Sequence, residues 1–153
     1  MPSKERNRLQ PWVMDAFHPQ RNRFISADDW FAAKLEDRFR PGWPDCLIKH
    51  KPSGRVWLTE LKWSALRTKV RIDLSPNQWQ HLKEWSAGPA DYSSLAVVGA
   101  DCSQRVYVVP IVVLSEPSQS LDVDEVDRLP GVRYLDASRA ALRDLPRLLL
   151  DAF

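Results

Sequence analysis

The sequence predicts a single α/β domain in which apolar strands are combined with helices. Its 153 residues match the usual size of one domain. The apolar fraction of 44% and the charged fraction of 27% are ordinary for a globular protein with a sizeable core. Segments with strand periodicity alternate along the chain with segments that carry helix-start and helix-stop signals. These observations exclude a disordered chain, a collagen-like repeat and a coiled coil.

The first 25 residues are basic and irregular. We expect residues 1–25 to form an N-terminal arm with one short element around residues 12–17. The first long helix is predicted over residues 26–39. Ser26 is a favourable N-cap, two aspartates follow in the first turn, and a Pro-Gly pair comes after the last residue.

Three strands are predicted next, at residues 45–50, 55–62 and 69–74. The sequence KPSG lies between the first two and predicts a hairpin turn. In the third segment, apolar residues alternate with charged ones, as in a strand with one buried face.

A second helix is predicted over residues 76–87, because Ser75 and Pro76 supply an N-cap and a first-turn proline. A buried strand is expected at 94–99. A further strand is expected at 105–114, where a proline at position 110 demotes part of it to an edge or a bend.

The remaining residues, 115–153, form a C-terminal extension that belongs to the same domain or to a dimer interface. Residues 115–131 are acidic and contain prolines and a glycine, which predicts a connection. A last helix is predicted over 138–153, with an interruption near Pro146.

The charge distribution indicates an acidic or nucleic-acid partner for the first half of the chain. Residues 1–76 carry 15 Lys and Arg against 9 Asp and Glu, whereas residues 77–153 carry 7 against 11. Such an asymmetry is typical of proteins that bind a polyanion with one part of their surface.

Nothing in the sequence predicts contact with a membrane. No stretch approaches 18 uninterrupted apolar residues, and the N-terminus lacks the apolar segment of a signal peptide. We therefore expect a cytoplasmic protein. Cys46 and Cys102 give neither a disulfide framework nor a zinc-site spacing, and we expect small buried side chains.

The chemistry is predicted at the open end of the first hairpin. Asp45 opens one strand, while Glu60 and Lys62 lie near the end of its partner and share one face of it. Two carboxylates that converge there would suit Mg²⁺ or Mn²⁺. Metal, carboxylates and a lysine that serves the attacking water are what phosphodiester hydrolysis needs.

The alternative for the same three residues is a solvated cross-strand ion pair. The apolar residues around them favour the functional interpretation: Trp57, Leu58, Leu61 and Trp63 flank the Glu and the Lys. Charges on a partly covered strand are rarely found without a partner or a role.

Pro44-Asp45 followed by Glu60-Leu61-Lys62 resembles the signature of the PD-(D/E)xK nucleases. The wider pattern RPGWPD, WLTELKW and LSPNQWQHL is similar to the VRR-NUC nucleases, especially their small stand-alone phage and prophage forms. The resemblance covers residues 26–99. It implies a restriction-endonuclease-like αβββαβ core with a mixed sheet, which we place at residues 26–114.

The resemblance also implies the roles of the site residues. Asp45 and Glu60 would ligate the metal, the carbonyl of Leu61 would add a ligand, and Lys62 would orient the nucleophilic water. Gln78 would point into the site from the second helix and bond the lysine, the water or a phosphate. The structural alternative for Gln78 is a polar residue at the boundary of an apolar helix face.

A glutamate from the first helix usually completes such a site, and Glu36 is the best match. Asp29 is the substitute on the same helix face. The alternative for Glu36 is an ion pair with Arg40, four residues further on.

Several residues around the site are candidates for contact with DNA. No acid occurs between Glu60 and Asp73, so the three basic residues Arg67, Lys69 and Arg71 could follow a phosphate backbone. A solvated strand face is the alternative for each of them. The candidates are Arg40, Trp43, Arg67, Lys69 and Arg71.

Together these observations predict a Mg²⁺- or Mn²⁺-dependent DNA endonuclease. The resemblance suggests cleavage of branched DNA such as a Holliday junction by a homodimer, because two symmetric nicks need two sites. The alternative is a catalytically inactive module with the nuclease fold, which binds nucleic acid or acts as an inhibitor. A restriction-type nuclease would use the same chemistry, but the sequence shows no base-reading element.

Overall fold

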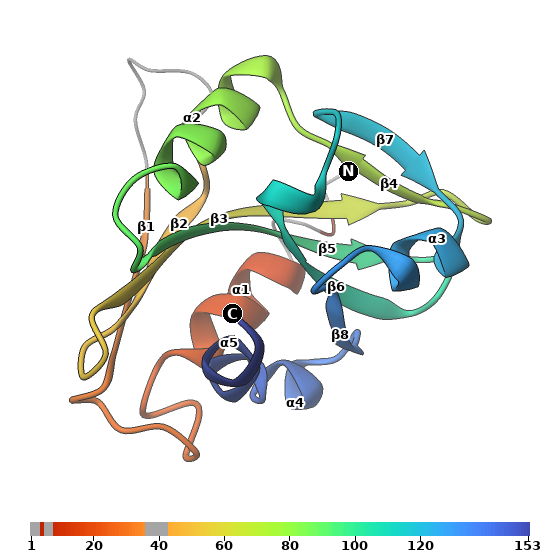
Figure 1. The fold of residues 1–153 in the computed structure, drawn as a ribbon. Coiled ribbons are helices and arrows are strands. Elements are labelled where there is room, and N and C mark those ends of the chain that lie inside the picture. The colour runs from red at the N-terminus through yellow and green to blue at the C-terminus, as the bar shows by residue number, and fades with distance from the viewer. Residues whose placement is uncertain (1–3, 5–7, 36–42) are drawn as a thin grey trace.

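The computed structural model describes residue 4 and residues 8–35 and 43–153, which form an α/β fold around a mixed sheet (Figure 1). Six strands lie in the order β1-β2-β3-β5-β6-β8, in which β3 and β5 are parallel and the other neighbours are antiparallel. The strands are β1 (Trp30–Lys34), β2 (Cys46–His50), β3 (Arg55–Ser64), β5 (Tyr92–Ala100), β6 (Arg105–Pro110) and β8 (Arg133–Asp136). A separate antiparallel pair consists of β4 (Val70–Asp73) and β7 (Ser118–Leu121).

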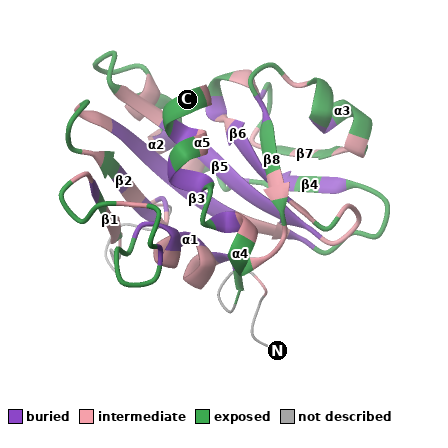
Figure 2. Ribbon diagram, turned by 90° about the horizontal axis from the view of Figure 1, so that it is seen from below, coloured by how far each residue is buried: buried purple, intermediate pink, exposed green. Residues whose placement is uncertain are grey.

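Helices cover both faces of the main sheet (Figure 1). Helices α1 (Gln10–Ala16), α4 (Arg139–Leu142) and α5 (Leu145–Ala152) lie on one face. Helix α2 (Pro76–Ser86), the β4–β7 pair and α3 (Val123–Arg128) lie on the other. Two buried clusters result, one on each side of the central strands, which Figure 2 shows as buried along their length.

Strand β3 separates the two clusters because successive side chains of a strand point to opposite faces. Trp57 and Leu61 belong to the cluster under α1, α4 and α5. Leu58 belongs to the cluster under α2, so Glu60 and Lys62, at even positions, face α2 as well.

The predicted helix over residues 26–39 is wrong where the structure describes it. Residues Trp30–Lys34 form β1, which pairs with β2 along its whole length. The Ser26 cap is real, since its hydroxyl accepts from the Asp28 amide, but it closes a single turn. Pairing with β2 and the packing of Trp30 on Trp57 override the local helix signals. Residues 36–39 lie outside the described residues.

The expected order of helix, three strands, helix and strand is met, but by different elements. The short element expected around residues 12–17 is α1, and it serves as the first helix. The first strand is β1, and the predicted third strand, β4, lies outside the main sheet. The core is therefore α1, β1, β2, β3, α2 and β5.

The second half of the chain contains more regular structure than predicted. The expected connection at 115–131 includes β7 and α3, and β8 was not predicted. The strand expected at 105–114 ends at Pro110 and continues as a 3₁₀ turn, Ile111–Val113, in agreement with the bend expected there. The last helix is broken into α4 and α5, with Pro146 in the first turn of α5.

In the part of the chain that the structure describes, every helix is too short or too polar to cross a bilayer.

Candidate active site

The β2–β3 hairpin brings Asp45 next to Glu60. Cys46 pairs with Thr59, so the residue before Cys46 lies opposite the residue after Thr59. The Asp45 carboxylate accepts a hydrogen bond from the Leu61 amide, with Oδ2 2.7 Å from the nitrogen. This bond fixes one carboxylate against the strand that carries the other.

Glu60 and Lys62 form an ion pair on the same face of β3. The Lys62 Nζ lies 3.7 Å from the Glu60 Oε1. Glu60 is only 2% exposed, while the Lys62 side chain keeps 20% of its accessible surface. A solvated ion pair does not describe this arrangement, because the carboxylate is buried. Burial makes its interactions stronger than they would be in water.

Gln78 reaches the same carboxylate from α2. Its Nε2 donates to the Glu60 Oε1 over 3.0 Å, and its Oε1 accepts from the Ser75 amide over 3.0 Å. The Ser75 hydroxyl accepts in return from the Gln78 amide, which completes a capping box. Gln78 is therefore held by the start of α2 and bonds Glu60 rather than Lys62. The S-x-x-Q spacing of Ser75 and Gln78 is the sequence signal of this capping box.

The Cys46 thiol is buried at this end of the hairpin, close to both carboxylates. Burial, reinforced by the charges of Asp45 and Glu60, raises the pKa of the Cys46 thiol far above its ordinary value. Cys46 therefore stays a neutral buried side chain and is no candidate for a thiolate ligand.

A hollow of about 340 Å³ lies beside Lys62. Trp63, Arg71 and Asp73 contribute to its walls, so it runs from the end of β3 toward β4. Arg71 is paired with Asp73 at 3.5 Å.

The other DNA-binding candidates lie around this region. Arg67 and Lys69 are exposed in the segment between β3 and β4, and Lys69 lies 4.0 Å from Asp122. Trp43 stacks on His81 of α2, with ring centroids 4.8 Å apart. Arg40 lies outside the described residues.

The resemblance implies a third acid, which is not found among the described residues. Glu36 lies outside them. Asp29 precedes Trp30, which pairs with His50, at the end of β2 opposite to Asp45. Five residues of strand span about 15 Å, so Asp29 lies too far from Asp45 to share a metal with it. The prediction that Asp29 could substitute for Glu36 is therefore wrong.

The two carboxylates that the hairpin brings together fit a hard divalent metal. Asp45 and Glu60 offer carboxylate oxygens side by side, which Mg²⁺ and Mn²⁺ prefer. Within residues 8–35 and 43–153, no cluster of three or more His, Cys, Asp or Glu is formed.

Comparison with solved structures defines the class of fold. The chain has the restriction-endonuclease-like α/β architecture with a mixed sheet, the fold of the PD-(D/E)xK nucleases, which confirms the predicted fold class. It is similar to Hjc of Archaeoglobus fulgidus, a Holliday junction resolvase from an archaeal hyperthermophile. The TM-score is 0.50 at 13% sequence identity, over 80% of this chain and 89% of that one. No protein-family model and no curated protein matches the sequence.

Proposed function

We propose that the protein is a metal-dependent endonuclease that hydrolyses phosphodiester bonds in branched DNA, as the resemblance to VRR-NUC nucleases suggests. The observation that carries this proposal is the buried Glu60, held by Lys62 and Gln78 and placed beside Asp45. A buried carboxylate with a lysine two residues away, which itself lines a hollow of about 340 Å³, is suited to hydrolysis of a phosphodiester.

Each residue has a distinct task in the proposed mechanism. Asp45 and Glu60 would hold the metal, and the Leu61 carbonyl would be a further ligand. A bound metal offsets the charge of the phosphate and lowers the pKa of a water. Lys62 orients the attacking water, and its partly exposed ammonium can reach one. Gln78 is a positioning residue, because it acts on the site through Glu60.

The third carboxylate is proposed to be Glu36. The acidic residues of the chain outside the described ranges are Glu5, Glu36 and Asp37. Neutralising each in turn separates them: we expect Glu36→Gln to lower metal affinity, and Glu5→Gln and Asp37→Asn to leave it unchanged. A loss confined to Glu5→Gln or to Asp37→Asn would move the assignment to that residue.

We further propose that the protein acts as a homodimer, in the cytoplasm or, if the chain is encoded by a phage, in the host cytoplasm. Two symmetric nicks in one junction need two sites. Residues 115–153 are then either part of the domain or the dimer interface. Light scattering at micromolar concentration would give twice 17.7 kDa for the dimer.

The proposal is tested with four labelled substrates: a four-way junction, a flap, a single strand and a linear duplex. Each is incubated with Mg²⁺, Mn²⁺ or EDTA. We expect cleavage that requires metal and favours the branched substrates. Glu60→Gln protein, purified in parallel, controls for contaminating nucleases. Inertness of the wild type on all four substrates with both metals would favour the alternative, an inactive nuclease-fold module that binds nucleic acid.

A further inference from the structure

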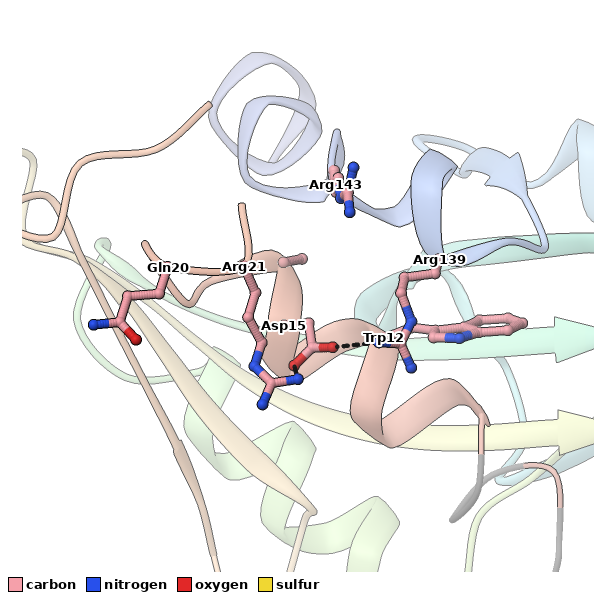
Figure 3. A pocket seen from close by; sticks show the side chains of 7 residues that line it. Trp12, Asp15, Gln20, Arg21, Arg139 and Arg143 are labelled. Carbon is pink, nitrogen blue, oxygen red and sulfur yellow. Dashed lines mark hydrogen bonds and ion pairs between the residues drawn. The ribbon is translucent and has the colours of Figure 1, made fainter. Parts of the chain in front are cut away.

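A pocket of about 240 Å³ lies between α1 and α4, on the face of the main sheet opposite to Glu60 (Figure 3). Three arginines line it, together with Trp12 and one acid, Asp15. Arg21 follows α1, while Arg139 and Arg143 come from the C-terminal region, more than a hundred residues away in the sequence.

The pocket carries more positive charge than its own acid can neutralise. Asp15 lies between Arg21 and Arg139, at 3.6 Å and 3.2 Å (Figure 3). Within the described residues, Arg143 has no acidic partner. Three guanidinium groups and one carboxylate leave a balance of two positive charges around one hollow.

A buried asparagine fixes the walls of this pocket. Asn22 is fully buried, and its Nδ2 donates to the carbonyl of Ala16 over 2.7 Å and to that of Arg143 over 2.9 Å. These two bonds tie the end of α1 to the residue that follows α4. The backbone of Arg143 is therefore held next to the Asp15 cluster before any ligand arrives.

A purely structural role would explain only part of this arrangement. One arginine paired with Asp15 would be sufficient to link α1 to α4. The second and third arginines add repulsion, which a bound anion would relieve. Guanidinium forks match phosphate oxygens in a bidentate geometry.

The charge and the lining of the pocket indicate which anion fits. A phosphomonoester carries about −1.5 to −2 at pH 7, which matches the excess charge, whereas a backbone phosphodiester carries only one negative charge. Trp12 adds an aromatic wall beside the arginines, and its ring is held edge-on against Trp63 with centroids 6.3 Å apart. An indole there could stack with a base.

We propose that this pocket binds a phosphomonoester attached to a nucleoside, either as a free nucleotide or as the phosphorylated end of a nucleic acid. The site is distinct from the candidate active site, because the main sheet separates them. It stands on its own residues and does not depend on whether the protein cleaves DNA.

The test is a binding titration of the full-length protein in metal-free buffer, so that nothing is cleaved. The probes are deoxyadenosine 5′-monophosphate and three short oligonucleotides that end in a 5′-phosphate, a 3′-phosphate or hydroxyls only. We expect phosphate-dependent binding that Arg143→Gln weakens by about tenfold or more. Arg139→Gln serves as a second variant, and circular dichroism verifies that both are folded.

Arg147→Gln is the matched control, because Arg147 lies on α5, is 83% exposed in its side chain and pairs with Asp151 away from the pocket. It should bind like the wild type. Equal binding of all probes with a terminal phosphate would identify the free phosphomonoester as sufficient, and binding of the phosphorylated oligonucleotides alone would identify a nucleic-acid end. The proposal is overturned if the hydroxyl-ended oligonucleotide binds as tightly as the phosphorylated ones, if no probe binds, or if Arg143→Gln and Arg139→Gln bind like Arg147→Gln.

Discussion

The two faces of the main sheet carry charge in different ways. On the α2 face, Glu60 is buried and bonded to Lys62 and Gln78. On the α1 face, Arg21 and Arg139 keep more than half of their side-chain surface exposed around Asp15. Buried, fixed charges suit a chemical step, because they interact strongly and need no reorganisation. Exposed arginines suit reversible capture of an anion. One strand, β3, supports both faces through its alternating side chains.

The largest effect is expected from the two carboxylates of the α2 face. Asp45→Asn and Glu60→Gln should each lower the cleavage rate by about a thousandfold or more, because loss of one metal ligand removes several kcal/mol of transition-state stabilisation. Binding of a phosphomonoester on the α1 face should not change. Single-turnover assays and the titrations described above measure the two quantities on the same protein preparations. A wild-type cleavage rate in either variant would show that the site is misplaced.

The next largest effect is a loss of stability caused by overpacking on the α1 face. Gly99 of β5 pairs with Trp63, and a Cβ on Gly99 would collide with the Trp63 ring. Gly99→Ala should therefore destabilise the protein by about 1–3 kcal/mol through overpacking, measured by urea unfolding. The same substitution in a Trp63→Leu background should cost less. Equal costs in both backgrounds would rule out the collision as the cause.

A third prediction distinguishes two roles of Gln78: capping of α2 and the hydrogen bond to Glu60. Ser75→Ala and Gln78→Ala each remove part of the capping box and should each lower stability by about 1 kcal/mol. Only Gln78→Ala also removes the hydrogen bond to Glu60, so only this variant should slow cleavage, by about tenfold. Similar rates in the two variants at a temperature where both are folded would reduce Gln78 to a capping residue.

The smallest effects are expected from the basic residues beside the proposed active site. Replacing Arg67, Lys69 or Arg71 by Ala should weaken duplex binding modestly and reduce the slope of log affinity against log salt by about 0.9 per lost phosphate contact. Arg67 should show the full change, since Lys69 and Arg71 already have acidic neighbours. An unchanged slope in all three variants would indicate that DNA approaches from elsewhere.

The sequence predicted the β2–β3 hairpin because its signals are local. Asp45, Glu60 and Lys62 lie within 18 residues, and a short turn leaves few ways to pair the two strands. The capping residues Ser75 and Pro76 similarly located α2. These features depend on neighbours in the chain, which a single sequence shows directly.

What the sequence did not predict depends on distant contacts. The residues around Ser26 have the sequence of a helix start, but the segment that follows pairs with β2 as a strand, beginning at Trp30. Strand β8 exists because β6 pairs with it, and its short polar segment had no apolar alternation to reveal it. The arginine pocket brings Arg21 next to Arg139 through the packing of α1 on α4, and no spacing in the sequence encodes that approach.

The central claim is that the α2 face performs a chemical step in which Lys62 serves the attacking water. Its most direct test is the single-turnover cleavage rate of Lys62→Ala on a four-way junction at saturating protein, with Lys69→Ala as the matched loss of one lysine. We predict that Lys62→Ala stays slower by about a hundredfold or more at saturation, while Lys69→Ala recovers the wild-type rate. Recovery of the Lys62→Ala rate at saturating protein would contradict the claim, because it would reduce Lys62 to one more binding residue.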